Sequence, residues 1–411
     1  MELQNTLRAI VDENGRLILP PETIASLGLV PGAEILLENT ASGTTLRRAA
    51  NHLAKVYIEP TSRCNLNCDI CIRNSWTVTQ GDMAGETFKC LSDSLRHFEY
   101  KPVISFGGFG EPLLHPDIIE MIAQAKEMAQ RVEVITNGLL LTEQMVRDFI
   151  HLGLDVLWFS VDSPRASAND GSSNLFSKIE MMDSLRRSLN SRRPETGFVF
   201  VATSSNVNQF PLLVRSANRY GVSRYMVTNV LPYSADMCNQ MLCTRVLDEV
   251  ESRPSPWLPL IQLPRIDWNE HTLTPLHQTL HAHHNIRIHE ASLDMPAGRC
   301  PFIETGVVAV SSDGAVSPCL ALMHSHVSYL QEKPRTVSRY VIGNINDMTL
   351  TEIWNDPNHL SFRKRVQEFN FPPCTSCGGC DMVAANQEDC FGNAFPTCGG
   401  CLWAWGVIQC P

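Results

Sequence analysis

The chain has little charge and no long apolar run. Only 18% of its 411 residues are Asp, Glu, Lys or Arg, and 43 acidic residues outnumber 33 basic ones. The formal charge of -10 repels nucleic-acid phosphates and offers no polybasic membrane anchor. About 18 consecutive apolar residues, as a transmembrane helix needs, occur nowhere, and residues 1–17 lack the basic start and apolar stretch of a signal peptide. We therefore expect a soluble, cytoplasmic protein.

Cysteine is plentiful, and its distribution is uneven. Of 15 cysteines, three fall within residues 64–71 and nine between 300 and 410. In a long, unexported chain, clustered cysteines more often bind metal or perform redox chemistry than form disulfides. The three isolated ones, Cys90, Cys238 and Cys243, are interpreted as ordinary core or loop thiols. With 44% hydrophobic residues, the chain can also fill a substantial core.

Residues 54–233 alternate short β-branched or aromatic runs with longer helical patterns. This alternation predicts an α/β fold with a parallel sheet and crossover helices, and six strands fit a partial (β/α)6 TIM-like barrel. The strands are expected at 55–62, 102–108, 131–138, 156–163, 197–204 and 224–230, with helices including 116–129 and 142–153.

The alternation of strands and helices ends in residues 234–299. Extended backbone is favoured there by Pro254, Pro256, Pro259 and Pro264, which predicts a connector. Its His-Ala-His-His run at 281–284 could be a metal patch, although a solvated loop is the simpler interpretation.

Residues 1–50 predict a separate small β-rich unit. Two strands flank a turn at 13–15, followed by a Pro-initiated helix, a Gly-ended helix and a strand. The pattern resembles the swapped-hairpin fold of AbrB-type regulators, which implies a homodimer through this domain. Residues 2–48 carry six acidic side chains against four arginines, which argues against DNA binding.

Three cysteines, Cys64, Cys68 and Cys71, directly follow the first predicted strand. Three thiolates in one short loop can hold three irons of a cubane and leave the fourth iron open. Structural zinc sites and structural clusters normally close with four protein ligands, so the triplet favours a site that receives a small molecule. A zinc site that borrows a distant fourth ligand is the alternative.

The C-x3-C-x2-C spacing after the first strand resembles the defining motif of the radical S-adenosylmethionine (SAM) superfamily. In that family SAM binds the open iron of a [4Fe-4S] cluster and is reductively cleaved to a 5'-deoxyadenosyl radical. The resemblance implies a low-potential electron donor such as ferredoxin or flavodoxin.

Motifs at the ends of the next four strands resemble the same family in order and position. Phe106-Gly-Gly-Phe-Gly-Glu-Pro is similar to its GGE motif, and glycines allow backbone to approach a ligand closely. Ordinary turns could account for each motif taken singly. The residues that the resemblance assigns to SAM are Gly107, Gly108, Gly110, Glu111, Asn137, Ser160, Asp162 and Asn206.

The region 300–411 resembles the SPASM extension of radical SAM enzymes, which holds two auxiliary [4Fe-4S] clusters. Two closed cubanes need eight thiolates, and nine are available, although their spacing departs from the common pattern and does not divide them between clusters. A zinc ribbon of Cys377 and Cys380 with Cys398 and Cys401 is the alternative. The expected ligands are Cys300, Cys319, Cys374, Cys377, Cys380, Cys390, Cys398, Cys401 and Cys410.

The Gly-Gly-Phe-Gly-Glu-Pro motif and the tail 389–411 are most similar to cofactor-modifying maturases of tungsten-containing aldehyde ferredoxin oxidoreductases. This resemblance implies hydrogen abstraction from a protein, peptide or pterin-cofactor substrate in the maturation of a tungsten enzyme. One alternative is a peptide maturase that forms thioether or carbon-carbon crosslinks. Two others are a DNA-binding redox regulator with an AbrB-like domain and a zinc-stabilised scaffold. No residue is identified as a catalytic acid or base.

Overall fold

The computed structural model describes residues 9–26, 35–40, 43–48, 52–76, 78–161, 172–243, 260–262, 269, 271–272, 274–275, 287–289, 298–330, 333–375 and 380–411. Three sequence predictions lie outside these residues: Asp162, Cys377 and the histidine run at 281–284. Within them, no helix is both long enough and apolar enough to cross a membrane.

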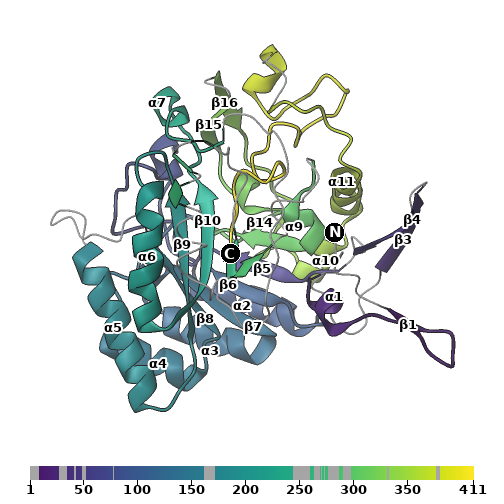
Figure 1. Ribbon diagram of the computed structural model, residues 1–411. Helices are drawn as coiled ribbons and strands as arrows, with labels where there is room; N and C mark the ends of the chain where they lie inside the picture. The colour runs from purple at the N-terminus through teal and green to yellow at the C-terminus, as the bar shows by residue number, and fades with distance from the viewer. Residues whose placement is uncertain are drawn as a thin grey trace, which may run out of the picture.

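A single sheet of eleven strands forms the centre of the described part of the chain (Figure 1). Its order is β12-β11-β10-β9-β8-β7-β6-β5-β13-β14-β17. All strands from β12 to β13 pair in parallel, whereas β14 and β17 pair antiparallel. The strands are β5 (Lys55–Ile58), β6 (Val103–Phe106), β7 (Arg131–Thr136), β8 (Val156–Ser160), β9 (Glu195–Ala202), β10 (Val222–Asn229), β11 (Leu260–Gln262), β12 (Arg287–His289), β13 (Val307–Val310), β14 (Ala315–Ser317) and β17 (Gly343–Asn344).

All six strands predicted for the barrel are present as β5 to β10, and the parallel α/β fold is confirmed. The sheet, however, extends past both ends of this set. The predicted connector contributes β11 and β12 beside β10, and the cysteine-rich region contributes β13 beside β5. Pairing between strands so far apart in the chain leaves no local sequence signal, and the expected domain boundaries at 54–233, 234–299 and 300–411 therefore remain predictions.

Amphipathic helices cover the outer face of the sheet (Figure 1). The predicted helix at 142–153 shows how the sequence delimits them: Thr142 accepts a hydrogen bond from the Met145 N–H at its start, and Gly153 ends it with a φ of 67°. The main core lies between these helices and strand residues such as Phe106 and Phe159. The helices are α2 (Gly85–Arg96), α3 (Ile118–Met128), α4 (Glu143–Leu152), α5 (Ser172–Ser188) and α6 (Phe210–Ala217), with η3 (Val207–Gln209) and η4 (Asn218–Tyr220) beside α6.

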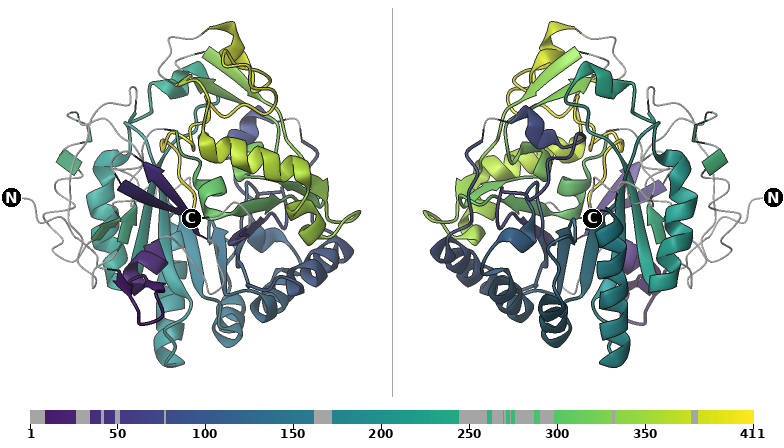
Figure 2. Two further views of the ribbon diagram at one scale, coloured as in Figure 1. Left: turned by 90° about the vertical axis from the view of Figure 1, so that its right-hand side faces the viewer. Right: turned by 90° about the vertical axis from the view of Figure 1, so that its left-hand side faces the viewer.

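The C-terminal third lies over the ends of the strands and beside β5 (Figures 1 and 2). Its tail returns to the barrel, where Gln409 N–H donates to Thr228 Oγ1 at 2.9 Å and Lys55 Nζ donates to the Pro411 oxygen at 2.6 Å. Its elements are α9 (Pro301–Thr305), η6 (Leu320–Leu322), β15 (His326–Leu330), β16 (Lys333–Val337), α10 (Leu350–Trp354), α11 (Pro357–Glu368) and η7 (Asp381–Ala384), with α7 (Ala235–Cys238) before the connector strands.

Two hairpins and a short helix make up the described N-terminal region. The hairpin of β1 (Ile10–Val11) and β2 (Leu17–Ile18) confirms the turn expected at 13–15, where Asp12 accepts backbone hydrogen bonds and Gly15 has a φ of 76°. Helix α1 (Pro21–Ser26) follows, and then the hairpin of β3 (Ile35–Thr40) and β4 (Gly43–Arg48). The AbrB-like fold and the dimer are not confirmed and remain predictions.

Candidate active site and cluster sites

The cysteine triplet lies in the loop that follows β5, at the carboxyl ends of the parallel strands. Cys64, Cys68 and Cys71 are all partly exposed. Cys71 N–H donates to the Cys68 carbonyl at 3.0 Å, which tightens the loop before η1 (Ile72–Ser75) begins. Parallel α/β folds place their active sites at this end of the sheet, so the loop occupies the expected position.

A basic side chain faces the triplet from inside the same loop. Arg73 Nε donates to Cys71 Sγ at 3.5 Å, and Arg73 Nη2 holds the Leu66 carbonyl at 2.9 Å. Burial raises the pKa of the Cys64 thiol, while the Leu66 N–H and Arg73 act against this shift. The sequence analysis missed Arg73, although a basic residue two positions after the last cysteine was a visible signal.

The glycine-rich loop after β6 packs against the cysteine loop at backbone distance. A Cβ on Gly110 would lie 1.9 Å from the Thr61 carbonyl oxygen, and Glu111 N–H donates to the Arg63 carbonyl at 2.8 Å. Gly108 has a φ of 103°, and a Cβ on Gly107 would lie 2.9 Å from Ile135. Glycine is therefore required here by the fit of the two loops, as well as by any ligand that approaches the backbone.

Glu111 connects the loop after β6 to the end of β7 by hydrogen bonds. Its buried carboxylate accepts hydrogen bonds from Thr136 Oγ1 at 2.6 Å, Leu113 N–H at 3.0 Å and Asn137 N–H at 2.7 Å. Burial raises the pKa of Glu111 despite these donors. These three hydrogen bonds hold the glycine-rich loop against the end of β7.

Asn137 joins the end of β7 to the cysteine loop. Its amide nitrogen lies 2.8 Å from Asn65 Oδ1 and 3.9 Å from Cys64 Sγ. The end of β8 leaves Ser160 exposed at the same edge of the sheet. Asn206, after β9, instead bonds the Thr203 N–H and the Val201 carbonyl, so its side chain stabilises its own turn.

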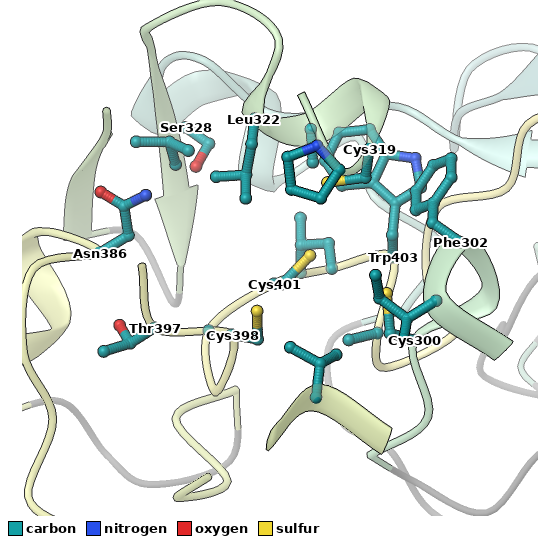
Figure 3. Close-up of a pocket in the computed structure, with 18 of the residues that line it drawn as sticks. Cys300, Phe302, Cys319, Leu322, Ser328, Asn386, Thr397, Cys398, Cys401 and Trp403 are labelled. Carbon is teal, nitrogen blue, oxygen red and sulfur yellow. The ribbon is translucent and has the colours of Figure 1, made fainter. Parts of the chain in front are cut away.

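Four cysteines of the C-terminal region line one buried cavity. Figure 3 shows Cys300, Cys319, Cys398 and Cys401 around it, with Phe302, Leu322 and Trp403 among the apolar side chains nearby. Cys300 precedes α9, Cys319 precedes η6, and Cys398 and Cys401 belong to one turn in which Cys401 N–H donates to the Cys398 carbonyl at 3.1 Å. Their spacing in sequence could not have revealed this grouping.

The cavity suits thiolates only if a positive charge compensates for burial. Burial raises the pKa of Cys300 to about 12, with nearby Cys401 adding to the shift. Burial likewise raises the pKa of Cys319, Cys398 and Cys401. Arg335 lines the cavity and acts against this rise in pKa for Cys398 and Cys401. A bound metal cluster would supply further positive charge, because metal ligation deprotonates a thiol.

Four other C-terminal cysteines are described and do not line this cavity. Cys380 and Cys390 are exposed, and Cys374 is half-buried close to the Cys398–Cys401 turn, with its Sγ 3.3 Å from where a Cβ on Gly399 would lie. Cys410 accepts a hydrogen bond from Trp403 Nε1 at 3.3 Å, and burial raises its pKa to about 11. Cys377 lies outside the described residues, so the zinc-ribbon alternative, which includes it, stays a prediction.

Both cysteine groups offer thiol sulfur, the donor that iron-sulfur clusters use. In the described part of the chain, no group of three or more His, Cys, Asp and Glu side chains is close enough to hold one metal ion.

The chain carries a radical SAM domain and a SPASM domain. The radical SAM family model matches residues 58–188, and the SPASM model, described as an iron-sulfur cluster-binding domain, matches residues 300–381. The protein is therefore a radical SAM enzyme: one domain binds a [4Fe-4S] cluster with SAM, and the other binds auxiliary iron-sulfur clusters.

A curated relative spans most of the molecule. The chain is 29% identical to the tungsten-containing aldehyde ferredoxin oxidoreductase cofactor-modifying protein of Pyrococcus furiosus. The match covers 87% of this chain and 96% of that protein. It is 23% identical to the pre-heme d1 synthase of Dinoroseobacter shibae, over 81% of the chain and 79% of that protein.

Solved structures share the fold at low sequence identity. Native anSMEcpe with bound AdoMet and the Cp18Cys peptide is 17% identical with a TM-score of 0.51, covering 81% of this chain and 88% of that one. Streptococcus suis SuiB bound to its precursor peptide SuiA is 14% identical with a TM-score of 0.51, covering 80% and 70%.

Proposed function

We propose that this enzyme uses SAM to abstract a hydrogen atom from a protein, peptide or cofactor substrate during maturation of a tungsten-dependent oxidoreductase. The observation that carries the proposal is the three-cysteine loop locked by Gly110 against the glycine-rich loop, in a chain similar over nearly its whole length to the P. furiosus cofactor-modifying protein. Both the site and the overall match are needed, because the site defines the chemistry and the match suggests the substrate.

Cys64, Cys68 and Cys71 would hold the catalytic cluster, whose open iron supplies the binding position and the electron for cleaving SAM. Arg73 stabilises negative charge on Cys71 through the Nε hydrogen bond. Glu111 holds the glycine-rich loop to the end of β7, and Asn137 holds the end of β7 to the cysteine loop. The C-terminal region lies over the strand ends, where it would help a bound substrate to exclude water from a reactive radical.

The four-cysteine cavity would hold one auxiliary cluster. The buried Cys300, Cys319 and Cys398 and the half-buried Cys401 provide four thiols, enough to close one cubane without a ligand from elsewhere. A second auxiliary cluster would then draw on the other five C-terminal cysteines. This division is supported by the shared cavity and by the exposure of Cys380 and Cys390.

The function is tested by anaerobic reconstitution with iron and sulfide, followed by dithionite and SAM. The expected product is 5'-deoxyadenosine, formed by the native enzyme and abolished by combined alanine substitution of Cys64, Cys68 and Cys71. That triple variant should retain the iron of the SPASM domain, whereas a Cys398→Ala, Cys401→Ala variant should lose about one cluster's iron. Absence of 5'-deoxyadenosine, even with an apo tungsten oxidoreductase and its pterin cofactor present, would contradict the proposal.

The peptide-crosslinking alternative is separated by its product. If the chain acts on a peptide, mass spectrometry after turnover will show loss of hydrogen from the peptide and no change in the pterin cofactor. Specific duplex binding would instead favour the DNA-regulator alternative.

A further inference from the structure

A buried hydrogen bond between a glutamate and a histidine joins the barrel to the C-terminal region beside the glycine-rich loop. Glu59, the first residue after β5, is fully buried, and its Oε2 lies 2.8 Å from Nε2 of His324. His324 follows η6 and is only 4% exposed. The other carboxylate oxygen of Glu59 accepts the Phe109 N–H at 3.3 Å. Glu59 therefore touches both the loop expected to contact SAM and the SPASM region.

The fit of this pair depends on a glycine. Gly108 has a φ of 103°, and a Cβ there would lie 3.0 Å from Glu59 Cβ and 3.2 Å from its Oε1. The loop can reach Glu59 only because this side chain is absent. The close contact fixes the position of the carboxylate and, through it, of His324.

Two aromatic rings enclose His324. The Trp76 ring, just after η1, lies 4.5 Å from the His324 ring between centroids, and Phe109 lies 5.1 Å from Trp76 in an edge-to-face arrangement. The backbone after His324 also covers the cysteine loop, since Val327 N–H donates to Ser75 Oγ at 3.3 Å. The enclosure thus combines residues from the cysteine loop, the glycine-rich loop and the SPASM region.

Two polar atoms in this enclosure are buried and find no hydrogen-bond partner in the described part of the chain: Nδ1 of His324 and Nε1 of Trp76. A buried polar group without a partner is costly, so such atoms mark a place for a ligand or an ordered water. Glu59 accepts from Nε2–H, and an imidazole that carries its single proton there presents Nδ1 as an acceptor. The indole Nε1–H is only a donor.

We propose that His324 and Trp76 form a substrate subsite that recognises an amide or lactam group, an H–N–C=O unit. An indole donor and an imidazole acceptor, on rings whose centroids lie 4.5 Å apart, complement a flat group that carries both a carbonyl oxygen and an N–H. The proposal rests on the proposed function, whose substrates contain such a unit either as a peptide bond or as the lactam of a pterin. Glu59 is a positioning residue that sets the tautomer and orientation of His324.

The test measures equilibrium binding of two probes to the anaerobically reconstituted, SAM-loaded enzyme: 2-amino-4-oxopteridine for the lactam and N-acetylglycine methylamide for the peptide bond. Trp76→Phe keeps the aromatic ring and removes Nε1–H. His324→Gln keeps a donor for Glu59 and removes Nδ1. Each variant should weaken binding of the recognised probe about tenfold, as expected when a buried partner is left unpaired.

His359→Gln is the matched control, since His359 is also buried with an unpartnered ring nitrogen in the described residues but packs against Trp354 of α10. The subsite is supported if binding of one probe weakens in both variants and not in the control. The probe that binds then shows whether the enzyme recognises a pterin lactam or a peptide bond. Binding of neither probe, or equal binding by all variants, overturns it. SAM cleavage without substrate is measured in parallel, so failure of the subsite is distinguishable from failure of the proposed function.

Discussion

At the scale of single residues, the glycine-rich loop is held by the close backbone contact of Gly110 and by the hydrogen bonds of Glu111. Gly110 approaches the Thr61 carbonyl so closely that no other side chain fits, and Glu111 satisfies three donors at once. The sequence predicted both residues as SAM contacts because the motif is recognisable. Their bracing role could not be predicted, because it depends on which strand ends become neighbours.

Gly110→Ala should impair both stability and SAM binding. The new Cβ would lie 1.9 Å from backbone, so one of the two loops must move. We expect a loss of about 2 kcal/mol in the free energy of unfolding, typical of overpacking, and at least tenfold weaker SAM binding. Denaturant unfolding and equilibrium SAM titration measure these effects.

Gly85→Ala is the control for this change, because a Cβ at Gly85 meets nothing within 4 Å. It should alter stability by less than about 1 kcal/mol, in the direction of greater helix stability. Equal behaviour of the two variants would show that the loops do not depend on the close contact.

At the scale of elements, the sequence predicted the strands that have a local apolar pattern. It did not predict which strands pair when they lie far apart in the chain. The strands β5 to β10 have apolar runs with polar motifs at their ends, and the hairpin of β13 and β14 surrounds a turn at Gly314. Nothing in Val307–Val310 indicates that it pairs with β5. The same limit applies to β11 and β12, which are only three residues each.

An ion-pair group ties β5 to β7 on the sheet and gives a pH-dependent prediction. Glu133 of β7 lies 3.2 Å from Lys55 Nζ of β5 and 2.9 Å from Arg131 Nε. Burial acts to raise the pKa of Glu133, but Lys55 and Arg131 outweigh it and lower the pKa below its ordinary value. A lowered carboxyl pKa contributes stability above the unfolded-state pKa, which disappears as the pH falls through the folded-state value.

Glu133→Gln should therefore destabilise the protein by about 3 kcal/mol at neutral pH, because it leaves buried cations without their partner. The difference between native protein and variant should shrink as the pH falls below about 4.5. Urea unfolding at several pH values measures it. A difference that stays constant from pH 7 to pH 3 would contradict the assigned ion pair.

At the scale of the whole molecule, the barrel and the SPASM region share one sheet. Four residues of β13 pair with four of β5, and the tail returns to contact Lys55 and Thr228. The two regions matched by separate family models are thus continuous through backbone hydrogen bonds. Their fixed arrangement also holds the three-cysteine loop and the four-cysteine cavity in a constant relation.

Removal of residues 300–411 should consequently leave a barrel that aggregates. The truncated chain would expose the edge of β5 and apolar residues that now contact the C-terminal region, such as Tyr57. Size-exclusion chromatography of residues 52–299 is the measurement, and residues 52–411 serve as the control, which should remain soluble. A monomeric, folded 52–299 fragment would show that the shared sheet is not needed for stability.

The pairing of β5 with β13 also has a consequence during protein synthesis. The two strands are about 250 residues apart in the chain, so at about 5–20 residues per second the ribosome needs roughly 12–50 s to deliver the second after the first. Throughout that interval the nascent chain presents an open strand edge next to three unliganded thiols. Chaperone occupancy and delivery of iron and sulfide must therefore be coordinated with translation.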